Sequence, residues 1–255
     1  MAQLKLTYFG LKARGEVARL ILTGGGIPFE DVRVDFCARP AYNEETQRRL
    51  ERYSTPECTY TAAEWLEMKD SLPLAALPLL EIDGIDTPVC QSRAINRHCA
   101  RLAGVEGETE EQKLLADMFA DCAHEYIEHL FTKYTYMLGK DGGNMKAEAR
   151  WARWDALSHV MKKDTIEYLM RFEALHRAHF NKPVDYVAGD SLTHADYQLL
   201  VTLDFMTFDF GYADLIDTHA PSLSACVANT KRNPLLTDYL ARNERNVFTA
   251  AGFAF

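Results

Sequence analysis

The first 36 residues alternate between two hydrophobic periodicities. Residues 4–9 alternate apolar and polar side chains and end in aromatics, which predicts a β-strand that stops at Gly10. Residues 14–23 place apolar side chains at helical spacing, and the three glycines at 24–26 predict the end of that helix. Alternation returns over residues 29–36, so the chain opens with a predicted β-α-β unit.

A polar, charged segment then interrupts the pattern. Residues 37–64 hold two prolines and no clear apolar period, and they are interpreted as an insertion. Residues 77–82 predict a third strand, and Asp83-Gly84 is typical of a hairpin turn. Residues 85–90 would form the returning strand, at a sheet edge or with a bulge because of its internal proline.

The pattern changes to helical from residue 91 onward. Gln91-Ser92 opens a predicted helix that ends at Gly104, and capping boxes begin at Thr109 and Thr193. The sequence therefore predicts an α/β part over residues 1–104 and an all-α part over residues 105–255.

Charge and composition exclude several classes of protein. The chain has 255 residues, 47% of them hydrophobic, with 28 Lys+Arg against 37 Asp+Glu and a net charge of −9. An acidic chain repels phosphate backbones, so no nucleic-acid partner is expected. No run of 18 apolar residues and no basic-then-apolar leader occurs, so neither a membrane span nor a secretory signal is expected.

The cysteine pattern favours a reducing compartment. The six cysteines are Cys37, Cys58, Cys90, Cys99, Cys122 and Cys226. They form no C-x-x-C pair and no metal-ligand spacing, and they are too sparse for a disulfide scaffold. We expect reduced thiols in a cytoplasmic protein.

The informative feature is an ordered set of short motifs. The set comprises Leu6-Thr7-Tyr8-Phe9, Arg14-Gly15-Glu16, Glu64-Trp65 with Lys69, Leu77-Pro78-Leu79-Leu80-Glu81-Ile82-Asp83-Gly84, Gln91-Ser92-x-Ala94-Ile95, and Gly189-Asp190-Ser191-x-Thr193-x-Ala195-Asp196. Each motif alone has a structural explanation: a core tyrosine, a packed tryptophan, a helix cap or an ordinary trans proline. Their order along most of the chain is far more specific.

This set resembles the cytosolic glutathione transferases, most closely the sigma class that includes the prostaglandin D synthases. The resemblance implies a thioredoxin-like N-terminal domain, an all-helical C-terminal domain and a homodimer that binds glutathione as co-substrate without a cofactor. It implies that Tyr8 hydrogen-bonds the glutathione sulfur and that Pro78 follows a cis peptide bond. The residues implied to hold the tripeptide are Arg14, Trp65, Lys69, the backbone of Leu77, Gln91 and Ser92.

The residue types suit that chemistry. A thiolate is a much better nucleophile than a thiol, and a phenol aimed at the sulfur favours the charged form. Arg14 adds a positive charge, and Ser92 at a helix N-terminus offers N–H groups to a carboxylate. Trp65 and Lys69, spaced i and i+4, would share a helix face toward the other carboxylate.

An acidic row on the predicted helix after residue 109 has two interpretations. Asp117, Asp121 and Glu125 follow one another at i, i+4 and i+8, which is usually a solvated face. The resemblance implies instead that Glu125 reaches the γ-glutamyl amine of glutathione in the partner subunit, although the usual residue there is aspartate. His124 and His129 nearby lack the spacing of a metal motif, and no metal site is expected.

A second, apolar pocket is predicted for the co-substrate. Phe9, Tyr134 and Met137 would line it, with an aromatic C-terminal tail at 247–255 as a candidate lid. The predicted function is a glutathione transferase whose Tyr8-stabilised thiolate attacks an electrophile, with peroxidase or prostaglandin isomerase side activity left open. The alternative is a non-catalytic relative that serves as a structural protein or a ligand carrier.

Overall fold

A computed structural model describes residues 3–10, 12–34, 67–138, 147–210 and 212–241 of the chain. For 131–138, 147–159 and 208–210 it describes the backbone alone. The predicted insertion at 37–64 and the C-terminal tail at 247–255 therefore lie outside the described residues.

A four-stranded sheet forms the N-terminal half. Its strands are β1 (Leu4–Phe9), β2 (Glu30–Val34), β3 (Leu79–Ile82) and β4 (Val89–Cys90), in the order β2-β1-β3-β4. β1 pairs parallel with β2 and antiparallel with β3, and β3 pairs antiparallel with β4. A parallel pair needs a crossover, which helix α1 (Ala13–Gly24) provides. The predicted β-α-β opening is confirmed.

The second hairpin is shorter than predicted. Of the predicted strand 85–90, only Val89–Cys90 joins the ladder, and Ile85 is 52% exposed. Pro88 has no N–H to donate, which explains why pairing starts only after it. The preceding strand begins at Leu79, directly after the Leu77–Pro78 peptide bond, which is cis as the resemblance implied.

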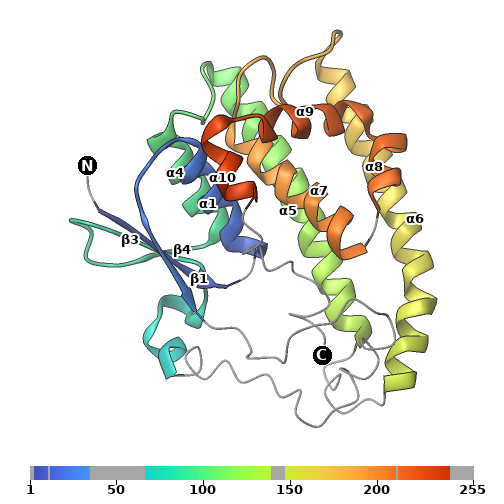
Figure 1. Cartoon of the computed structure of the whole chain (residues 1–255), viewed down its shortest axis with the longest axis horizontal. Helices are drawn as coiled ribbons and strands as arrows, with labels where there is room; N and C mark the ends of the chain where they lie inside the picture. The colour runs from blue at the N-terminus through green and yellow to red at the C-terminus, as the bar shows by residue number, and fades with distance from the viewer. Residues whose placement is uncertain (1–2, 11, 35–66, 139–146, 211, 242–255) are drawn as a thin grey trace.

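Helices are the other regular elements of the described chain. They are α4 (Ser92–Ala103), α5 (Glu110–Leu138), α6 (Ala147–His179), α7 (His194–Phe210), α8 (Ala213–His219), α9 (Pro221–Lys231) and α10 (Thr237–Ala241), with short 3-10 turns at Lys69–Ser71, Pro73–Ala75 and Pro234–Leu236. α1 and α4 pack on the sheet, and in the second half the long helix α5 packs against both α7 and α6 (Figure 1). This confirms the predicted thioredoxin-like half followed by an all-helical half. Gly104 ends α4 with a left-handed φ of 67°, and we propose the domain boundary there.

One hydrophobic core runs through both halves. It includes Leu6 of β1 and Ile21 of α1 together with Leu200 of α7, all fully buried. The close approach of α1 to α7 depends on Gly24, because a Cβ there would lie 2.4 Å from the hydroxyl oxygen of Tyr197. α1 is therefore buried from both sides, by the sheet and by α7.

Both predicted capping boxes form hydrogen bonds at helix starts. The backbone N–H of Gln112 donates to the Thr109 hydroxyl at 3.1 Å. At α7 the fully buried Asp196 accepts the N–H of Thr193 at 2.8 Å and the N–H of Val187 at 2.7 Å. Asp196 thus joins the loop before α7 to the first turn of that helix.

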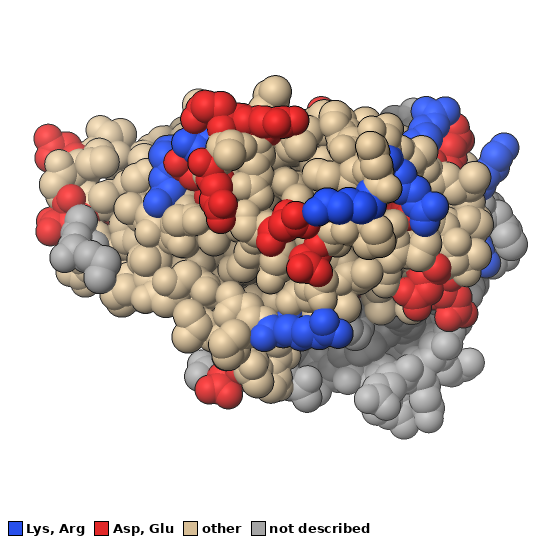
Figure 2. Space-filling view, turned by 90° about the horizontal axis from the view of Figure 1, so that it is seen from above, with Lys and Arg blue, Asp and Glu red and all other residues tan. Residues whose placement is uncertain are grey.

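The surface carries charges of both signs. Figure 2 shows acidic and basic side chains interspersed on one face, with uncharged areas between them. Within the described ranges, no helix is long and apolar enough to cross a membrane.

Replacing Asp196 with alanine would leave two buried N–H donors without an acceptor. We expect Asp196→Ala to lower the free energy of unfolding by about 2–4 kcal/mol, measured by urea denaturation. Asp190→Ala is the matched control, because that carboxylate is 66% exposed and pairs with Lys182 on the surface; we expect a change within about 0.5 kcal/mol. Equal losses in the two variants would contradict this role of Asp196.

Candidate active site

A cavity of about 430 Å³ lies where the N-terminal half meets α5. It is lined by Arg14, Ala76, Leu77, Pro78, Gln91, Ser92, Arg93, His124, Glu125 and Glu128. These residues come from the start of α1, the turn before β3, the start of α4 and the middle of α5. The structure therefore gathers five of the residues predicted to bind glutathione, together with Glu125, around one hollow.

Tyr8 lies at the end of β1, beneath the first turn of α1. Its hydroxyl accepts the backbone N–H of Arg14 at 3.3 Å, and its ring is 5% exposed. Gly15 permits this packing, since a Cβ there would lie 2.4 Å from Cδ1 of the Tyr8 ring. The Tyr8 hydroxyl thus sits at the positive end of α1. It contacts the backbone of Arg14, which lines the cavity, while Tyr8 itself is not among the described residues that line it.

Burial raises the pKa of Tyr8 to about 12, while the positive charges of Arg14 and Arg19 act against that rise. A phenol with such a pKa is neutral at pH 7 and keeps its proton for donation. The prediction that Tyr8 acts as a neutral hydrogen-bond donor is consistent with its surroundings.

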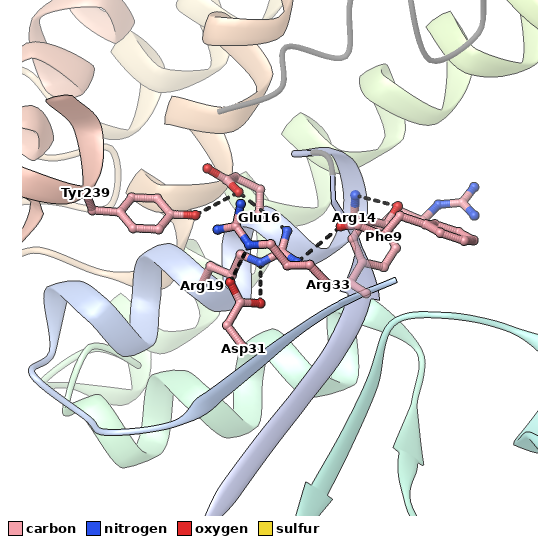
Figure 3. A network of polar contacts seen from close by, with 8 residues as sticks. Phe9, Arg14, Glu16, Arg19, Asp31, Arg33 and Tyr239 are labelled. Carbon is pink, nitrogen blue, oxygen red and sulfur yellow. Dashed lines mark hydrogen bonds and ion pairs between the residues drawn. The ribbon is translucent and has the colours of Figure 1, made fainter. Parts of the chain in front are cut away.

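A buried charge network lies on the inner side of α1 (Figure 3). Arg19, 1% exposed, donates to Asp31 of β2 at 2.8 Å and to the backbone oxygen of Phe9 at 3.2 Å. Its guanidinium carbon lies 5.7 Å from the centre of the Tyr8 ring. Glu16, one turn before Arg19, accepts a hydrogen bond from the Tyr239 hydroxyl of α10 at 3.0 Å. The network therefore fixes the end of β1, and with it Tyr8, against α1.

Arg14 makes a two-point ion pair with a residue of the helical half. Its Nε lies 2.7 Å from Oε1 of Glu128, and its Nη2 lies 2.6 Å from Oε2. Burial opposes ionisation of Glu128, but the Arg14 guanidinium outweighs it and holds the pKa of that carboxyl below its usual value. The positive charge assigned to Arg14 is thus already paired.

The turn before β3 and the start of α4 form the opposite wall. The cis Leu77–Pro78 bond places both residues on the cavity, where Leu77 is 9% exposed. Gln91 has a positive φ of 76° and makes no side-chain capping hydrogen bond to α4. Ser92 is buried as the first residue of α4, so the N-terminus of that helix faces the cavity. A non-glycine residue held at positive φ beside a cavity is typical of functional sites.

The other predicted site residues are less well placed or not described. Lys69 is half-buried in a 3-10 turn and is not among the described residues that line the cavity. Trp65 lies outside the described residues, so the predicted pair on one helix face stays a prediction. Phe9 packs edge-on against Tyr8 with 5.4 Å between ring centres. Tyr134 and Met137 belong to α5, but their side chains are outside the described part of the chain.

The acidic row on α5 divides into two parts. Asp117 and Asp121 both accept from Arg97 of α4, at 2.7 and 2.9 Å, so they are ion-paired and not simply solvated. Glu125 is exposed and borders both the cavity above and a second one of about 560 Å³ between α5 and α6. Its position leaves its carboxylate available to a ligand or a neighbouring subunit.

Sequence reasoning missed four residues of the cavity wall: Ala76, Arg93, His124 and Glu128. His124 entered the sequence analysis only as part of a possible metal motif, and Glu128 belongs to the same stretch of the chain. Their i, i+4 spacing, and the i, i+3 spacing from Glu125 to Glu128, place all three on one face of α5. That signal was present, but nothing in the sequence joined this face to Arg14.

The comparisons with known proteins agree with each other. A family model described as "Glutathione S-transferase, C-terminal domain" matches residues 146–243. Glutathione S-transferase P of Caenorhabditis elegans is 30% identical over 201 residues, 79% of this chain and 76% of that protein. Glutathione S-transferase P 10 of the same organism is 29% identical over 245 residues, 96% of this chain and 93% of that protein.

A solved structure gives the same result. The Pi-class glutathione S-transferase of Onchocerca volvulus superposes with a TM-score of 0.66 at 26% identity, covering 93% of this chain and 91% of that one. These relatives carry the class name P or Pi, so the sigma class stays a prediction.

The raised pKa of Tyr8 can be measured directly. In a spectroscopic pH titration, we expect the phenol that disappears in Tyr8→Phe to ionise near pH 12, well above the usual value of about 10. The difference spectrum between the two proteins isolates this residue from the other tyrosines. A difference signal that titrates at or below pH 10 would contradict a buried, neutral phenol.

Proposed function

Because this chain belongs to the glutathione transferase family, we propose that it joins the sulfur of glutathione to an electrophilic carbon of an apolar co-substrate in the cavity beside Tyr8. The observation that carries the proposal is the buried Tyr8 hydroxyl at the N-terminus of α1, next to a cavity walled by the cis Leu77–Pro78 turn and the open end of α4. Glutathione is a peptide that carries a thiol and two carboxylates. A hydroxyl suits its sulfur, and the N–H groups of a helix N-terminus suit one of its carboxylates.

In the proposed mechanism Tyr8 stabilises the thiolate. Its O–H donates to the sulfur and favours the charged form, so the thiol proton is released to solvent near neutral pH. The sulfur lone pair then forms the bond to carbon, and the leaving group departs with the electron pair of the broken bond. The α1 N-terminus, through the N–H of Arg14, polarises the Tyr8 hydroxyl in the same direction.

Glutathione would lie with its backbone beside Leu77 and one carboxylate at the start of α4. The N–H groups there and the Ser92 hydroxyl are suited to an anion, and Gln91 adjoins them. Trp65 and Lys69 are proposed for the other carboxylate on the resemblance alone.

We also propose that Phe9, Tyr134 and Met137 line the apolar pocket for the co-substrate, and that the protein is located in the cytoplasm. Peroxide reduction and prostaglandin isomerisation are side activities to assay with the same protein.

A homodimer is part of the proposal. Leu74 is 74% exposed on a turn where both Leu74 and Ala75 have positive φ values of 57° and 46°. A strained backbone that holds an apolar side chain in water is compatible with burial by a second subunit. Ala76, two residues on, lines the same cavity as Glu125. This chain's own Glu125 lies at that cavity, and on the resemblance alone we propose that Glu125 of a partner subunit reaches the γ-glutamyl amine of this glutathione.

The role of Tyr8 is tested by the pKa of bound glutathione, followed by thiolate absorbance across pH. We expect a pKa well below that of the free thiol in the wild type and a rise of about 1–2 units in Tyr8→Phe. At neutral pH this lowers the thiolate fraction, so kcat/KM should fall about ten- to a hundredfold. Tyr186→Phe, remote from the cavity, is the matched control and should match the wild type.

The same titration separates the proposal from its alternative. Bound glutathione with an unshifted pKa, or no binding, would mean that the fold serves as a ligand carrier or a structural protein. In that case the catalytic proposal fails.

The dimer is tested by light scattering coupled to size exclusion. We expect the wild type to run as a dimer and Leu74→Glu to dissociate toward monomer, because a buried unpaired carboxylate is costly. Ile85→Glu, at another exposed apolar position on the same half, should stay dimeric. A wild-type monomer, or equal behaviour of the two variants, would refute this interface.

A further inference from the structure

The charged groups around the cavity cancel. Two guanidiniums, Arg14 and Arg93, face two carboxylates, Glu125 and Glu128. Arg93 also lies 3.6 Å from Asp121 on the neighbouring helix. Bound glutathione would add carboxylates and a thiolate. In the described wall each of these positive charges is thus already opposed by a carboxylate, and a further anion would find no net attraction there.

On the α5 side of the cavity, Glu128 neutralises the positive charge of Arg14. Its carboxylate takes both donors of the Arg14 fork, which satisfies the guanidinium in the geometry that Arg prefers. The side chains are 47% and 32% exposed for Arg14 and Glu128, so the pair sits at the cavity wall and not in the core. Both residues line the cavity in which the proposed function places glutathione, so a charged co-substrate in that cavity would feel their electrostatic field.

His124 does not compete for Glu128 at neutral pH. Its Nε2 lies 3.7 Å from Oε1, but burial lowers the pKa of His124, against the opposing pull of Glu128. The imidazole is therefore neutral near pH 7, and Arg14 keeps the carboxylate. Other charged groups that act on His124 are Arg14 and Arg93, which favour the neutral form, and Asp121, which opposes it.

Resting on the proposed function, we propose that Glu128 determines co-substrate specificity: by pairing with Arg14 it removes a positive charge from beside the sulfur, so the enzyme selects uncharged electrophiles over electrophiles that carry a carboxylate. Without Glu128, the Arg14 guanidinium faces the same cavity unpaired. One unit charge a few ångströms away, in a partly exposed site, changes the relative binding of an anion by about tenfold.

The test compares two related electrophiles, chlorodinitrobenzene and its ring carboxylate, chlorodinitrobenzoate. The measured quantity is the ratio of kcat/KM for chlorodinitrobenzoate to kcat/KM for chlorodinitrobenzene. We expect Glu128→Gln to raise this ratio about tenfold, because the amide keeps the shape but not the charge. Added salt should shrink the difference, as for any partly exposed charge.

Two control variants separate charge from shape. Glu128→Asp keeps the carboxylate, so the ratio should stay near the wild-type value even if overall activity changes. Glu111→Gln removes a carboxylate from the exposed first turn of α5, outside this cavity, and should leave the ratio unchanged. If Glu128→Gln lowers both rates equally, Glu128 only holds Arg14 in place and the specificity proposal is wrong.

Failure of the proposed function would look different. A wild type that conjugates neither electrophile refutes the transferase proposal, and Glu128 is then tested by binding. The probes are anilinonaphthalene sulfonate and the uncharged phenylnaphthylamine, titrated by fluorescence into the wild type and Glu128→Gln. A selective gain in affinity for the sulfonate in Glu128→Gln supports the role of Glu128, and an unchanged affinity ratio overturns it.

Discussion

A guanidinium with 1% of its side chain exposed holds the N-terminal half together. Burying such a charge is costly unless it is paired and hydrogen-bonded, so Arg19 must keep Asp31 and the carbonyl of Phe9 in reach. That requirement fixes α1 against both β2 and the end of β1. Tyr8 precedes Phe9, and its position beneath the first turn of α1 follows from the same contacts. Glu16 and Tyr239 extend the network to α10, so α10 is tied to α1, the helix that packs over Tyr8.

The cavity exists because α1 and α4 present their N-termini toward the same side. An N-terminus exposes N–H donors and the positive end of the helix dipole, which suits a hydroxyl acceptor at α1 and an anion at α4. The hydrophobic core shared by both halves then brings α5 across this opening. A pair of opposite charges, Arg14 and Glu128, joins the two halves at the cavity wall, so the same contact affects both the docking of the halves and the electrostatics of the site.

Much of the local structure follows from local sequence. Apolar periodicity predicted β1 and α1, Gly104 predicted the end of α4, and Asp196 predicted the start of α7, because propensity and capping depend on residues a few positions apart. The strand predicted over residues 85–90 is longer than the observed one, Val89–Cys90. Strand length depends on which backbone N–H groups can bond to the neighbouring strand, and the local pattern does not show this. Neither interpretation of the acidic row on α5 included the ion pairs of Asp117 and Asp121 with Arg97, because periodicity does not reveal which helix lies opposite.

Local sequence accounts for the order of the elements, the helix caps and the residue types of the site, including a tyrosine at a strand end and an arginine that opens a helix. These depend on short-range geometry, which the chain carries with it. The pairing of Arg14 with Glu128, a residue 114 positions away, emerges only when the two halves of the chain are folded together. Such a contact depends on how two helices dock, and the docking is fixed by the shared core and by the buried charge of Arg19, which no local pattern records.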